Sequence, residues 1–103
     1  MVPVNDIVFL EAAQALGKTF AALGGDDPAR LDALFRRCFT RAPRDDERTL
    51  LAQFLKAQRE RFTTNQLDPA PLAGKGDTAP SERAAWTALA RALLNLDEMI
   101  TKG

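Results

Sequence analysis

Three clusters of carboxylates are the residues in this sequence best suited to support a reaction: 26–27, 45–47 and 97–98. General acid–base catalysis needs carboxylates held in a cleft, with their pKa values pushed apart. The first two clusters stand where helices are predicted to begin, and capping and the helix dipole account for acidic residues there. We therefore interpret these two clusters as helix starts rather than as catalytic groups.

Asp97 falls on the apolar face of the last predicted helix, about 20° from Trp86 at 100° per residue. A carboxylate that faces a core must be paired, hydrogen-bonded or protonated. One interpretation is a structural pair with an arginine or with backbone donors of the corner at 40–44, and the other is a catalytic or ligand-binding acid. The structural pair is favoured, and we predict Arg41 as the partner because a guanidinium suits bidentate pairing.

The sequence has no histidine and no tyrosine, and Cys38 is its single cysteine. Without histidine, the chain by itself cannot form a Ser-His-Asp or Cys-His site, nor ligate zinc or haem through imidazole. Cys38 has no His or Cys partner and is interpreted as an inert buried thiol. We therefore predict no enzymatic activity, no cofactor and no metal site.

Overall charge argues against binding to nucleic acid, because 14 basic and 14 acidic residues cancel. The arginines at 36–48 are interrupted by the acids at 45–47, so they form no continuous positive field. No apolar run approaches the roughly 18 residues of a membrane span, and the start of the chain does not resemble a signal peptide. The predicted partners are other domains of a parent protein or a separate protein.

Three further residues are candidates for an interaction. Trp86 could be a ligand platform, although a tryptophan on an apolar stripe is more typical of a core. Asn95 points away from the face that carries Asp97, so we expect it at solvent, a loop or another domain. Glu98 follows Asp97 in the same acidic pair. With the irregular segment 63–79, Trp86 supports an alternative function, a ligand- or glycan-binding domain.

Proline and glycine divide the 103 residues into four predicted helices, at about 6–23, 26–40, 45–62 and 78–101. We expect an all-α fold, a compact antiparallel bundle in one domain, with a long loop before the last helix that could hold one short turn at 68–72. Gly17 predicts close approach of another helix. The apolar stripes comprise Phe9, Ala12, Ala13, Leu16, Phe20, Leu23, Leu31, Leu34, Phe35, Cys38, Leu50, Leu51, Phe54, Leu55, Phe62, Trp86, Leu89, Ala90, Leu93, Leu96 and Ile100.

Three segments together resemble one known family. They are NDIVFLEAA at 5–13, LFRRCFTRAP at 34–43 and AAWTALARALLNLDE at 84–98. They are similar to segments in the C-terminal region of planctomycete cytochrome-C-associated proteins, in the domain of unknown function numbered 1553. The likeness spans nearly the whole chain, with departures at Ile7, Thr40 and Arg44 and in the loop around 66–77. Thr40 replaces a glycine of the family, and Arg44 replaces a capping Thr or Ser.

The resemblance implies the kind of protein to which the chain belongs, but it implies no activity. Members of that family are large, exported, multidomain proteins, often with a haem domain near the N-terminus. This chain has no CxxCH motif, so any haem would belong to another part of the parent, and no catalytic residue set is implied. The leading hypothesis is a non-catalytic structural or interaction module at the C-terminus of such a protein. An enzyme completed by another domain, using Asp97 and Glu98, is a third hypothesis.

Overall fold

A computed structural model describes the backbone of residues 4–23, 25–64 and 78–102, and the side chains within 10–23, 25–64 and 78–96. These residues form four helices and no strand, so the predicted all-α bundle is confirmed for the part described. The loop and short turn predicted within 65–77 lie outside it. The helices are α1 (Val4–Ala22), α2 (Asp27–Phe39), α3 (Asp45–Thr63) and α5 (Pro80–Lys102).

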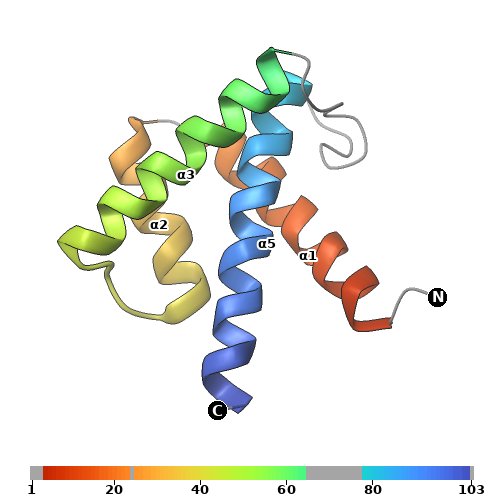
Figure 1. Ribbon diagram of the computed structural model, residues 1–103, viewed down its shortest axis with the longest axis vertical. Helices are drawn as coiled ribbons and strands as arrows, with labels where there is room; N and C mark the ends of the chain where they lie inside the picture. The colour runs from red at the N-terminus through yellow and green to blue at the C-terminus, as the bar shows by residue number, and fades with distance from the viewer. Residues whose placement is uncertain (1–3, 24, 65–77, 103) are drawn as a thin grey trace.

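Helix α5 is the centre of the bundle. It packs most extensively against α1, which passes behind it in Figure 1, and next against α3. Helices α2 and α3 lie together on the other side of the view, and both also contact α5. The core therefore forms around the upper and middle turns of α5, whereas its last turns extend beyond the other helices (Figure 1).

The buried side chains follow the predicted stripes in the middle of each helix. The largest fully buried residues are Trp86, Leu34, Leu55, Leu89 and Thr87. Four predicted core positions are wrong: Ala12, Leu23, Leu50 and Leu96 are exposed, Leu50 to 64% and Leu96 to 50%. Leu23 follows the last residue of α1. Leu96 belongs to the last two turns of α5, and the last turns of this helix extend beyond the other helices (Figure 1).

Close approach of two helices at Gly17 is confirmed. A Cβ atom placed on Gly17 would lie 2.8 Å from the backbone nitrogen of Thr87 and 2.9 Å from its Cα. Real Cβ atoms essentially never approach other atoms so closely. Glycine is therefore required at this position for α1 to lie directly on the backbone of α5.

The connections between helices are held by caps that the sequence indicates. Asp26 caps α2, and its carboxylate accepts a 3.0 Å hydrogen bond from the backbone N–H of Ala29. The helix ends at Thr40, which has a left-handed conformation with φ of 59°. At the start of α3, the backbone N–H of Arg44 donates to Glu47 at 2.8 Å. The Arg44 side chain has no acceptor, so it cannot supply the other half of a capping box.

Candidate functional site

Arg59 of α3 is the hub of the largest polar cluster in the described chain. Its guanidinium donates to Asp27 of α2 at 2.6 and 3.1 Å. It also donates through Nε to both carboxylate oxygens of Glu82 of α5, at 3.2 and 3.0 Å. One arginine thus ties together three helices at the end of the bundle where α5 begins.

Two further side chains complete this group, which we call the Arg59 cluster: Asp27, Arg30, Arg59, Glu82 and Trp86. Arg30 donates to Asp27 at 2.5 Å, and its Cζ lies 5.0 Å from the centroid of the Trp86 ring. The indole N–H of Trp86 donates to Glu82 at 3.1 Å. The cluster therefore contains two guanidinium groups and two carboxylates, and its charges balance.

The cluster holds its carboxylates in the ionised form. Hydrogen bonds from Arg59 lower the pKa of Asp27 to about 2, against the opposing effect of burial. Hydrogen bonds from Arg59 also lower the pKa of Glu82, and hydrogen bonds to Asp27 raise that of Arg59. A general acid needs a raised carboxyl pKa, and a strong base needs a free carboxylate. This arrangement suits a structural clamp and does not suit proton transfer near neutral pH.

Sequence reasoning missed the Arg59 cluster. Asp27 was interpreted as part of a helix start, which accounts for its position but not for its contacts. One signal was present: Arg59 lies about 40° from Leu55 around α3, at the edge of the buried stripe. A long cation at that edge needs a carboxylate from a neighbouring helix. Another signal was Glu82, one helical turn before Trp86.

Arg41 pairs with a carboxylate other than the one predicted. Its guanidinium makes a bidentate pair with Glu47 of α3 at 2.9 and 3.0 Å, and its Cζ lies 4.9 Å from the centroid of the Phe35 ring. Those hydrogen bonds lower the pKa of Glu47 to about 2. The side chain of Asp97 lies outside the described residues, so its pairing with Arg41 stays a prediction.

The candidate interaction residues differ in how far the structure exposes them. Trp86 has no exposed surface, so it belongs to the core and cannot serve as a platform on which a ligand stacks. Asn95 is exposed, as expected. The side chain of Glu98 and the segment 65–77 lie outside the described residues. Cys38 is only partly buried, and its predicted inward position is confirmed only in part.

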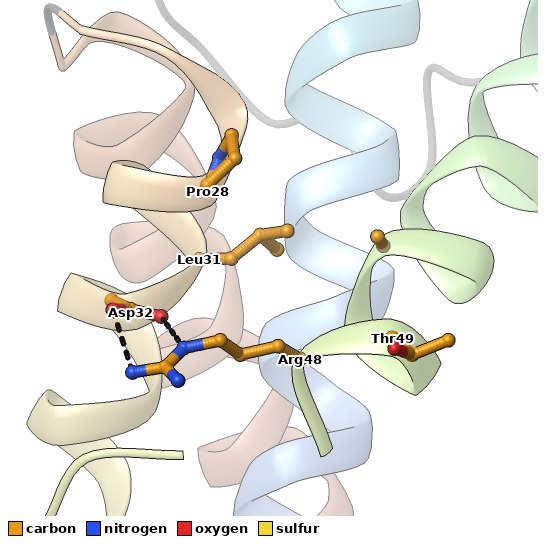
Figure 2. A pocket seen from close by; sticks show the side chains of 6 residues that line it. Pro28, Leu31, Asp32, Arg48 and Thr49 are labelled. Atoms are coloured by element: carbon orange, nitrogen blue, oxygen red, sulfur yellow. Dashed lines mark hydrogen bonds and ion pairs between the residues drawn. The ribbon is translucent and has the colours of Figure 1, made fainter. Parts of the chain in front are cut away.

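A groove opens between α2 and α3, with a volume of about 300 Å³. Figure 2 shows Leu31 of α2 beside it and the side chain of Arg48 extending from α3 to Asp32 of α2. Arg48 donates to Asp32 at 3.1 and 3.3 Å and to Asp45 at 3.0 Å. The charged groups at this groove therefore already have partners. The lining residues are Pro28, Leu31, Asp32, Arg48, Thr49 and Ala52.

A second groove, of about 320 Å³, lies where α1, α2 and α5 meet. We call it the Arg37 groove. Five of its lining residues are small or apolar, and Arg37 is the charged one. Arg37 is exposed, and no described side chain or backbone group forms an ion pair or hydrogen bond with its guanidinium. The lining residues are Ala12, Ala15, Leu16, Arg37, Cys38 and Leu94.

Other kinds of site are not found in the described residues. No group of His, Cys, Asp or Glu side chains there could hold a metal ion. No described helix combines the length and the apolar character that crossing a membrane requires. Searches for similar proteins found no match among family models, curated proteins or solved structures.

Proposed function

We propose that this chain is a non-catalytic helical module that packs against other domains of a larger protein or against a protein partner. The observation that carries the proposal is the Arg37 groove, a largely apolar recess between three helices whose arginine has no ion-pair partner among the described residues. The most elaborate polar group, the Arg59 cluster, is occupied in holding helices together. The chain thus presents a surface suited to binding and, in its described part, no poised acid–base pair.

The family resemblance of the sequence supports a proposal about the larger protein in which the module works. We propose that the chain is the C-terminal part of a large exported protein of the planctomycete cytochrome-C-associated kind. The module would then fix the arrangement of domains whose chemistry lies elsewhere. The alternative, a domain that binds a ligand or glycan, has less support because Trp86 is fully buried.

Site-specific photo-crosslinking in the producing cell tests the proposal. A photoreactive amino acid is placed in turn at Ala15 in the Arg37 groove, at Ala52 in the α2–α3 groove, and at Lys56. All three positions are exposed. We expect strong crosslinks from at least one groove position to polypeptide outside residues 1–103, either in the same protein or in a partner. Lys56 serves as a control for chance encounters.

Crosslinks from both grooves no stronger than those from Lys56 would contradict the proposed function. Turnover of a substrate by the chain alone, lost on replacing Glu82 by Gln, would contradict it independently. In that case the Arg59 cluster would be an active site and not a clamp.

A further inference from the structure

The Arg37 groove has the size of an anchor site for side chains. Its volume of about 320 Å³ lies at the low end of the range for ligand pockets, roughly 300–1,000 Å³. Ala12, Ala15 and Leu16 form one wall on α1, Cys38 lies on α2, and Leu94 closes the groove from α5. Such a recess can bury one or two large apolar side chains, and burying each is worth about 1.5–3 kcal/mol.

The charge at the rim of the groove favours a partner with an anionic group. Among the described side chains, Arg37 has no carboxylate partner, whereas Arg41 is paired with Glu47 and Arg48 with Asp32. Glu11 and Lys18, the exposed charged residues on the described part of α1, have opposite signs. Arg37 is the one charged residue among those that line the groove, and its guanidinium favours an anionic group there.

We propose that the Arg37 groove binds an acidic, amphipathic segment of a partner polypeptide or of another domain. An apolar side chain of that segment fills the recess between α1, α2 and α5. A carboxylate about one helical turn away pairs with Arg37. This inference rests on the proposed function and names the surface and the chemistry of its partner.

A second copy of this chain fits the groove less well. Asp46 and Leu50 of α3 are both exposed and one turn apart, so they offer the required pair of groups. They project from the convex surface of a single helix, which provides one large anchor. Stable interfaces bury about 1,200–2,000 Å² in total, far more than one leucine and one ion pair provide. A separate segment is the better occupant, because it can bury further surface along the helices beside the groove in addition to the side chain in the recess.

The single cysteine provides a direct readout of occupancy, because Cys38 lines the groove. The experiment measures the rate at which N-ethylmaleimide alkylates Cys38 in the presence of two synthetic helical peptides of about 15 residues. Both peptides carry the same leucines at helical spacing, but one has glutamates and the other lysines on the flanks. Fluorescence anisotropy of labelled peptides gives the dissociation constants independently.

We expect the glutamate peptide to bind and slow the alkylation of Cys38 at least about fivefold, and the lysine peptide to have little effect. The change Arg37→Glu should weaken binding of the glutamate peptide about tenfold and improve that of the lysine peptide. Arg36→Glu is the matched control. It makes the same change of charge at the next residue, which is exposed but does not line the groove, and it should leave the preference intact.

Three outcomes would overturn the inference: equal protection by both peptides, the same loss of binding in the two arginine variants, or protection that rises with protein concentration without peptide. The last outcome would show that a second copy fills the groove. Crosslinks to outside polypeptide from Ala52 alone would leave the proposed function standing and still reject this groove.

Discussion

Replacement of Gly17 by Ala tests the contact on which the bundle depends, the one between α1 and α5. Taken alone, Gly→Ala within a helix stabilises by about 1 kcal/mol. Here the new Cβ would meet the backbone nitrogen and Cα of Thr87 at 2.8 and 2.9 Å. Backbone atoms within α5 cannot rotate aside as a side chain can, so the two helices must separate.

The expected size of the effect follows from these opposing contributions. Overpacking a well-packed core costs about 1–3 kcal/mol, occasionally more, and a rigid neighbour places this contact at the upper end. Subtracting the gain in helix propensity leaves a net loss of about 1–2 kcal/mol in the free energy of unfolding. For a domain of this size, that loss lowers the Tm by roughly 4–16 °C.

Thermal and urea unfolding, followed by circular dichroism, measure the change. Ala12→Gly is the control, since it exchanges the same residue types at an exposed position of α1 and should cost only about 1 kcal/mol. Adding Thr87→Ala to Gly17→Ala should rescue stability only in part, because the backbone contacts remain. A Gly17→Ala protein as stable as the parent would refute the close approach of α1 to α5.

Three other changes have defined outcomes. Arg59→Leu should lower the free energy of unfolding by about 1–3 kcal/mol at neutral pH, discounted for partial exposure, because two carboxylates lose their common partner. In the parent, the folded pKa of Asp27 is about 2 against an ordinary 3.8, so its stabilisation is present above about pH 4 and is lost as the pH falls towards 2. Denaturation at several pH values should show this loss in the parent and a smaller loss in Arg59→Leu, in which Arg30 still pairs with Asp27. Thr40→Gly should raise stability in urea unfolding by about 1 kcal/mol by relieving the positive φ of a β-branched residue, and a lower stability would argue against that conformation. Arg44→Thr should raise the Tm by completing the capping box with Glu47, a gain of about 0.5–1 kcal/mol that Glu47→Gln would reduce.

The helices and their contacts were predictable where local chemistry decides them. The acidic cap and Pro28 place the start of α2, and Gly17 predicts the close helix contact that the structure confirms. The exposure of Leu50 and Leu96 was not predictable from the helical pattern. A helical pattern gives the direction of a side chain, but whether a neighbouring helix reaches it depends on helix lengths and crossing angles.

The ion-pair partners of charged side chains were harder still to predict from the sequence, because they come from different helices. Asp27 and Arg59 are 32 residues apart, and only the packing of α2 against α3 and α5 brings them together. The sequence predicts Arg41 as the partner of Asp97, whereas its partner among the described side chains is Glu47. Glu47 was interpreted as a helix-start residue, and it is one, since it also accepts from the backbone of Arg44. A residue with two roles is easily assigned only the local one.

NMR titration of the side-chain carboxyl carbons of Asp27 and Glu82 tests directly whether the Arg59 cluster is a structural clamp. We expect Asp27 to titrate with a pKa of about 2 and Glu82 to titrate below its ordinary value of 4.5. A midpoint above about 6 for either group would show a carboxylic acid kept protonated near neutral pH, as catalytic acids are. That result would contradict both the clamp and the proposal that the module is not an enzyme.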